Sequence, residues 1–216
     1  MGFCITSGVA NSTQAMQFLS ALPNLRLGPG YKDDTTVLSN NSAANISPNT
    51  NGFLLEAILL QRTTKFSAMA LNLIKSLWTP MLSNNETSSG ASWEYVNQEG
   101  NPGLSSYTSL SHPWGGAPTY LLTQYVAGLQ RAAGAAGYGY GSWFVDPSVG
   151  VKMVASASAT LVTAFNGSLS VMWNVSGSVM DVVIKAPERT SGKFILGETE
   201  IFLLGKDTYE SKLDVF

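Results

Sequence analysis

Two short segments of the sequence carry the side chains best suited to chemistry. The first, ASWEYVNQEG, places Glu94 directly after Trp93. The second, SLSHPWGGAPTY, holds the only histidine, His112, two residues before Trp114. Charged residues make up only 12% of the chain, so a carboxylate in an aromatic setting is a candidate acid or base.

This combination of side chains suits a sugar ligand. Aromatic rings stack on sugar faces, polar groups bond the hydroxyls, and carboxyl groups transfer protons when a glycosidic bond is hydrolysed. Structural interpretations stay open, because a lone Glu94 can be a solvated or helix-capping acid and His112 a hydrogen-bonded structural residue. Trp78, Trp143 and Trp173 sit in apolar patterns typical of a core. The sequence has no cysteine–histidine metal cluster, no GxGxxG or P-loop and no GxSxG elbow, so we expect neither metal nor cofactor.

The first half of the chain has helical periodicity. Asn11 predicts a capping box ahead of a short helix that ends at Pro23. Apolar faces predict further helices over 53–60 and 66–78, and Pro118 suits the first turn of another. Between them, the polar stretch GPGYKDDTTVLSNNSAANISPNTNG predicts a long irregular loop that contains two adjacent aspartates.

The second half of the chain has the pattern of a β-domain. From about Ser142 onward, short segments rich in β-branched and aromatic residues alternate with turn signals. Asn166-Gly167 predicts a two-residue type I′ hairpin, because both central positions of that turn need positive φ. We therefore expect helices packed on helices, a glycine-rich hinge over 134–142 and then an antiparallel β-sandwich.

Composition limits the partners of the chain. Its 216 residues, 44% of them hydrophobic, can bury a substantial core. The net charge is −2 and no run of Lys or Arg occurs, so we expect no nucleic acid and no membrane surface as partner, and a neutral ligand. No apolar run approaches the roughly 20 residues of a membrane span, and the single Cys4 excludes an intramolecular disulfide.

Six Asn-X-Ser/Thr sites predict a secreted glycoprotein, although chance is the alternative in a chain rich in Asn, Ser and Thr. The glycosylation candidates are Asn11, Asn40, Asn45, Asn85, Asn166 and Asn174. At Asn11 the capping and glycan-bearing interpretations compete. No signal peptide is visible in MGFCITSGVANSTQ, so we expect the N-terminus of the full protein to lie outside this chain.

The order of these motifs resembles a known family. Trp-Glu, a loop of about 17 residues, and then SHPWGG running into YLLTQYVAGL is similar to the C-terminal part of α-L-rhamnosidases of glycoside hydrolase family 78, especially fungal ones. ISPNTNGFLLEAIL and LIKSLWTPML resemble the preceding helices, and VKMVASASATLVTAFNGSLSVMWNV resembles the sandwich that follows. The resemblance implies an α+β multidomain fold, with part of an (α/α)6 six-hairpin barrel over 1–135 and a β-sandwich over 142–216.

The resemblance also implies roles for the candidate residues. Glu94 occupies the position of the general base that activates water in inverting hydrolysis of a terminal α-L-rhamnosyl unit. His112 matches a sugar-hydroxyl contact. Trp93 and Trp114 are expected to be pocket walls, a role inferred from their aromatic rings more than from the family's pattern. Inversion needs a second, protonated carboxyl group roughly 6.5–9.5 Å from the base.

The chain departs from the family in one respect. The general acid and several acidic sugar contacts of the family lie in earlier hairpins, so this chain is expected to be a fragment with little activity by itself. The alternatives are another inverting glycosidase on the same barrel, fucosidase- or glucoamylase-like, and a non-catalytic carbohydrate-binding protein.

Overall fold

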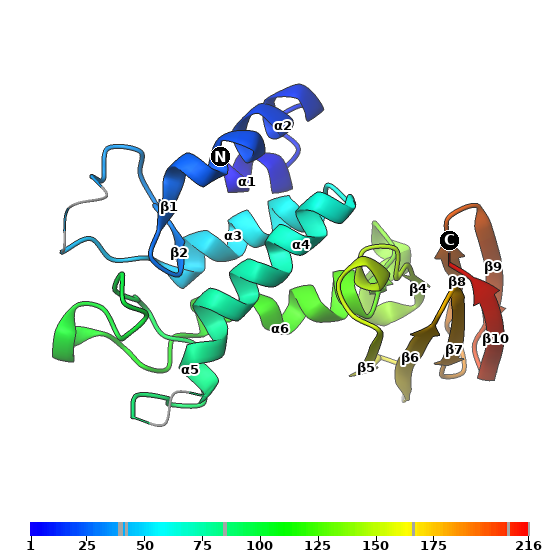
Figure 1. The fold of residues 1–216 in the computed structure, drawn as a ribbon. Coiled ribbons are helices and arrows are strands. Elements are labelled where there is room, and N and C mark those ends of the chain that lie inside the picture. Colours follow the sequence, from blue (N-terminus) through cyan, green and yellow to red (C-terminus); the bar gives the residue numbers. More distant parts are fainter. Residues whose placement is uncertain (39–40, 42, 84–85, 166, 207, 216) are drawn as a thin grey trace. The chain divides into compact units, whose positions relative to one another are not determined.

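The chain divides into two units at Thr119 and Tyr120. The computed structural model describes residues 1–38, 41, 43–83, 86–165, 167–206 and 208–215. Helices dominate the unit Met1–Thr119, and two four-stranded sheets make up most of the unit Tyr120–Phe216 (Figure 1). This arrangement confirms the α+β class. Within the described ranges, no helix has the length and hydropathy of a membrane-spanning segment.

The first unit is built from short helices and one small hairpin. The helices are α1 (Gly2–Thr6), α2 (Ser12–Ala21), α3 (Pro48–Leu59), α4 (Thr64–Leu73) and α5 (Thr79–Ser83), and α6 (Ala117–Leu121) crosses the boundary between the units. A π-helix, Ile74–Trp78, joins α4 to α5, and 3₁₀ turns span Leu22–Leu25, Ser105–Tyr107 and Pro113–Gly115. The hairpin consists of β1 (Arg26–Leu27) and β2 (Gly30–Tyr31).

Local signals account for the helix starts. The side chain of Asn11 accepts a hydrogen bond from the Gln14 backbone N–H at 2.9 Å, and the Gln14 side chain accepts from the Asn11 N–H at 3.0 Å. This confirms the capping box. Ser47 caps α3 by accepting from the Thr50 N–H at 3.3 Å, so α3 begins earlier than the predicted 53–60.

The second unit is a β-sandwich of two four-stranded sheets. One sheet has the order β10 (Thr208–Asp214), β7 (Val179–Lys185), β6 (Ser168–Ser176), β5 (Ser156–Val162). The other has the order β3 (Leu129–Arg131), β4 (Ser142–Val145), β8 (Ser191–Leu196), β9 (Thr199–Leu204). The second sheet is mixed, because β4 and β8 run parallel. The prediction of a wholly antiparallel sandwich is therefore wrong: the chain builds β5, β6 and β7 of the first sheet before it returns to pair β8 with β4.

Alternating side chains from both sheets form one core. Its buried members include Leu129, Trp143, Val145, Leu169, Val171, Trp173, Met180, Val182, Ile184 and Phe194. On β6 and β7 the buried positions alternate with less buried ones, as expected for strands with one face on the core. Val171 pairs with Ile184 and Trp173 with Val182, so large apolar side chains lie in adjacent registers.

The boundary between the units precedes the predicted glycine-rich hinge. Residues from Tyr120 onward belong to the sandwich unit, whereas the sequence assigned residues up to 135 to the helical one. Two contacts explain the difference. The Trp173 indole N–H donates to the Ala127 carbonyl at 3.2 Å, and β3 pairs with β4. The segment Ala135–Tyr140 forms 3₁₀ turns between β3 and β4, inside the second unit.

The β5–β6 connection is antiparallel but differs from the predicted turn. Val162 lies opposite Ser168, and the Thr163 N–H donates to the Gly167 carbonyl at 2.9 Å. Gly167 therefore closes the loop rather than occupying its centre. Asn166 lies outside the described residues.

Gly192 provides a test of the sandwich packing. A Cβ at this position would lie 2.3 Å from Cδ2 of Trp143, whose ring covers the glycine from the paired strand. We expect Gly192→Ala to lower the free energy of unfolding by about 1–3 kcal/mol, because overpacking displaces a buried indole. Urea unfolding followed by circular dichroism measures this. Ser158→Ala, at an exposed position of β5, should change the stability by less than about 0.5 kcal/mol. Equal stability of the two variants would contradict this packing.

Candidate functional site

The segments that carry Glu94 and His112 lie side by side. The Glu94 backbone N–H donates to the Ser109 carbonyl at 2.9 Å, and the His112 N–H donates to the Ser92 carbonyl at 2.7 Å. The Ser109 N–H in turn donates to the Glu94 carboxylate Oε2 at 3.2 Å. These backbone hydrogen bonds hold the two segments side by side in antiparallel directions. The Ser109 N–H also fixes one oxygen of the Glu94 carboxylate.

Two buried tryptophans attach these segments to the helices beneath them. The Trp78 indole N–H donates to the Gly115 carbonyl at 2.7 Å. The Trp93 indole N–H donates to Ser89 Oγ at 3.1 Å, and its backbone N–H approaches the sulfur of Met81 at 3.4 Å. Both segments are therefore tied to the continuous helix formed by α4, the π-helix and α5.

Trp93 and Trp114, both predicted as pocket walls, lie in opposite environments. Trp93 has no exposed surface, so in this structure its ring cannot contact a ligand, and its role is to pack beneath Glu94. In an extended segment successive side chains point to opposite sides, which leaves Glu94 half-buried at the surface. Trp114 is 75% exposed, and its ring lies edge-on to the half-buried His112 with centroids 6.3 Å apart. Only Trp114 of this pair is accessible to a ligand.

The loop between the two segments has a further support that sequence reasoning missed. Ile46 and Val96 exchange backbone hydrogen bonds of 2.8 and 2.9 Å. Ile46 is fully buried, and the Gly103 N–H donates to the Tyr95 carbonyl at 3.0 Å. The loop after Glu94 is therefore built on the segment that precedes α3. In the sequence, the only signal for this pairing was the apolar Ile46 within the polar stretch that precedes α3.

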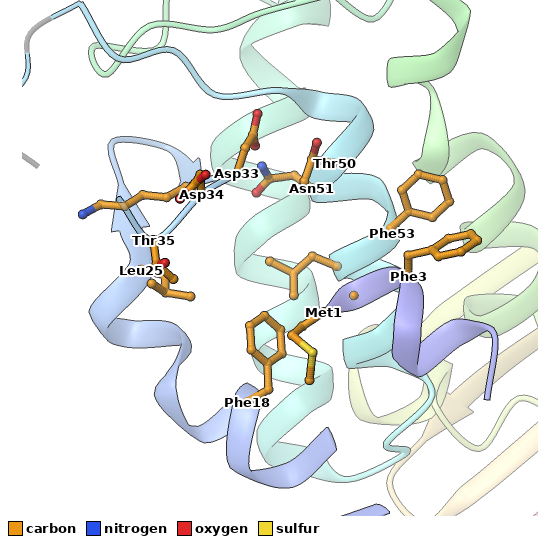
Figure 2. A pocket seen from close by; sticks show the side chains of 13 residues that line it. Met1, Phe3, Phe18, Leu25, Asp33, Asp34, Thr35, Thr50, Asn51 and Phe53 are labelled. Atoms are coloured by element: carbon orange, nitrogen blue, oxygen red, sulfur yellow. The ribbon is translucent and has the colours of Figure 1, made fainter. Parts of the chain in front are cut away.

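A separate cavity of about 370 Å³ lies elsewhere in the helical unit. Its lining is mainly apolar and aromatic: Met1, Phe3, Phe18, Leu25, Phe53 and Leu54. Figure 2 shows Asp33 and Asp34 on one side of the cavity and the rings of Phe3 and Phe53 on another. Neither Glu94 nor His112 lines it.

The two aspartates at this cavity differ in acidity. Desolvation by the surrounding chain raises the pKa of Asp33 to about 6, even though the residue is exposed by its accessible surface, and a backbone hydrogen bond from Ser47 acts in the opposite direction. The Thr36 backbone N–H, which donates to Asp34 Oδ1 at 2.7 Å, lowers the pKa of Asp34, and the Thr36 side chain adds to this. Nothing in the local sequence distinguishes the two residues, because the desolvation of the Asp33 carboxyl and its Ser47 contact depend on the fold.

The remaining sequence expectations concern metals and glycans. Within the described ranges, no group of three His, Cys, Asp or Glu side chains is placed to hold a metal ion. Asn11 serves as a helix cap, Asn45 donates from its amide to the Ala43 carbonyl at 3.0 Å, and Asn174 lies exposed on β6. Asn40, Asn85 and Asn166 lie outside the described residues. Glycosylation of these positions stays a prediction.

Comparison with known proteins gives matches among solved structures only. No family model and no curated protein matches the sequence. The chain is similar to native α-L-rhamnosidase from Aspergillus terreus, with 14% identity and a TM-score of 0.48 over 93% of this chain and 26% of that one. It is also similar to α-L-rhamnosidase from Dictyoglumus thermophilum, with 12% identity and a TM-score of 0.39 over 93% of this chain and 27% of that one. The chain spans about a quarter of the length of these structures.

Asp33 and Asp34 form a matched pair for a titration experiment. We expect the side-chain carboxyl carbon of Asp33 to titrate near pH 6 in an NMR experiment and that of Asp34 below 3.8. Since the folded-state pKa of Asp33 is raised, its contribution favours the folded state most below pH 3.8 and is lost as the pH rises through about 6. Asp33→Asn should abolish this fall in stability with rising pH, because asparagine has no carboxyl group that titrates. Coincident titration of both residues near 3.8 would contradict the desolvation of the Asp33 carboxyl.

Proposed function

We propose that the chain is part of a glycoside hydrolase that removes terminal α-L-rhamnosyl units with inversion, and that Glu94 is its general base. The observation that supports this is the backbone pairing of the Ser92–Glu94 and Ser109–His112 segments. It places a surface carboxylate on a segment paired with the one that carries an imidazole and an exposed indole, and these are groups suited to a sugar-hydrolysing site.

Each residue has a distinct role in this proposal. Ser109 orients the Glu94 carboxylate through Oε2, and Oε1 takes the proton of the water that attacks the anomeric carbon. His112 donates to or accepts from a sugar hydroxyl. Trp114 offers an exposed ring face to the apolar side of the sugar or its aglycone. Trp93 acts only by fixing the backbone on which Glu94 stands.

The inverting reaction also needs a carboxylic acid that protonates the leaving oxygen. We propose that this acid belongs to a part of the whole protein outside this chain, together with most of the sugar contacts. The secreted, glycosylated state predicted from the Asn-X-Ser/Thr sites is part of the same proposal. The purified 216-residue chain is then expected to show no measurable turnover of an aryl α-L-rhamnoside, whereas the complete gene product turns it over.

Replacement of Glu94 by glutamine in the complete gene product tests the base. Glutamine keeps an oxygen that can accept from the Ser109 N–H, so the loop should stay folded while the base is lost. We expect kcat on an aryl α-L-rhamnoside to fall by about 10²–10⁴-fold with rhamnose binding retained. Turnover and binding are measured by aglycone release and by calorimetry.

Glu99→Gln is the matched control, because Glu99 is an exposed acid in the same loop. It should leave kcat within twofold of the unchanged protein. Unchanged turnover in Glu94→Gln would reject the base and favour a non-catalytic carbohydrate-binding role for this loop. Turnover restricted to aryl fucosides or glucosides would assign the protein to another inverting glycosidase.

A further inference from the structure

A basic groove lies on the helical unit, lined by residues that take no part in the proposed catalysis. It has a volume of about 730 Å³ and runs between the β1–β2 hairpin and the α4 helix with its π-helical continuation. The polar and charged residues that line it are Arg26, Tyr31, Lys65, Asn72, Lys75 and Ser76.

The groove concentrates positive charge in a chain that is weakly negative overall. It holds three of the chain's 12 lysines and arginines, and no aspartate or glutamate lines it. Lys193, Lys206 and Lys212, in the sandwich unit, each form an ion pair with an acidic side chain. Arg26, Lys65 and Lys75 form no ion pair with a described residue, so their charges are free to attract an anion.

Arg26 is held in place before any ligand arrives. Its Nη2 donates to Ser76 Oγ at 3.2 Å, and its guanidinium lies 5.2 Å from the centroid of the Tyr31 ring. Ser76 Oγ donates to the Pro29 carbonyl at 2.6 Å, which ties the hairpin to the helix. Asn51 fixes Tyr31 by accepting from its N–H at 2.9 Å and donating to its carbonyl at 3.0 Å. A guanidinium fixed in this way loses little entropy when it binds a carboxylate or sulfate group.

The spacing of the two lysines indicates an extended ligand. Lys65 and Lys75 lie on the same side of one continuous helix, about 15 Å apart along its axis at 1.5 Å per residue. A single small anion would bridge both ammonium groups only if the two lysine side chains reached toward each other along the helix. A chain molecule with repeated negative charges can contact both lysines and Arg26.

We propose that this groove binds an acidic saccharide chain, whose carboxylate or sulfate groups contact Arg26, Lys65 and Lys75. The choice of a saccharide rests on the proposed function, and the choice of an anion rests on the groove alone. The sequence predicted a neutral ligand because its net charge is small; the fold collects three cations that are separated by up to 49 positions in the sequence.

The test is a binding measurement on the 216-residue chain. Affinity electrophoresis or calorimetry compares polygalacturonate with its fully methyl-esterified form, and dextran sulfate with dextran. We expect binding only to the charged member of each pair, and an affinity that falls as salt rises. The polymer that binds more tightly distinguishes carboxylate from sulfate as the recognised group.

Two triple variants of equal charge change make the result specific. Arg26→Gln/Lys65→Gln/Lys75→Gln should weaken binding at least tenfold, whereas Lys193→Gln/Lys206→Gln/Lys212→Gln, on the sandwich, should change it less than twofold. Circular dichroism confirms that both variants are folded. Equal loss in both variants, equal binding of the neutral polymers, or equally tight binding of single-stranded RNA would overturn the proposal. Glu94→Gln should leave binding of the acidic polymers unchanged, because Glu94 does not line the groove. Failure of the catalytic proposal and failure of the groove proposal therefore appear in different measurements.

Discussion

Buried indole N–H groups impose the constraint on which much of both units depends. Four of the five tryptophans are buried, and a buried N–H without an acceptor costs about 1–3 kcal/mol. Each of the four finds an acceptor: Trp78 at Gly115, Trp93 at Ser89, Trp143 at Thr190 and Trp173 at Ala127. Three of these bonds join segments more than thirty residues apart in the sequence. They decide which loops lie against which helix or sheet.

In the helical unit this constraint sets the exposure of the candidate base. The burial of Trp93, with its N–H bonded to Ser89, fixes the orientation of the extended segment. The next side chain, Glu94, must then face outward, where its carboxylate accepts a hydrogen bond from the Ser109 N–H. The question raised by a Trp-Glu pair in a charge-poor chain has a physical answer: the tryptophan anchors the segment, and the glutamate is left at the surface. Trp114, the one tryptophan outside this set, is left accessible.

Sequence reasoning succeeded where the determining contacts are local. The Asn11 capping box depends on residues three apart, and the helices and strands follow from apolar periodicity. It failed where the contact partner is distant. The indole bond to Ala127 draws residues from Tyr120 onward into the sandwich, and Trp93 is buried by the helix beneath it. The parallel pairing of β4 with β8 likewise depends on a partner more than forty residues away.

Charge shows the same limit in a different form. A net charge of −2 describes the sum and not the arrangement, and one buried amide fixes part of that arrangement. Asn51, 1% exposed, holds both backbone groups of Tyr31 and also donates to the Ser47 carbonyl. Tyr31 faces the basic groove, and Asp33, two residues later, reaches the cavity and accepts from Ser47. One side chain that satisfies three backbone groups therefore positions Tyr31 at the edge of the basic groove and the segment that leads to Asp33, features that no count of charges could place.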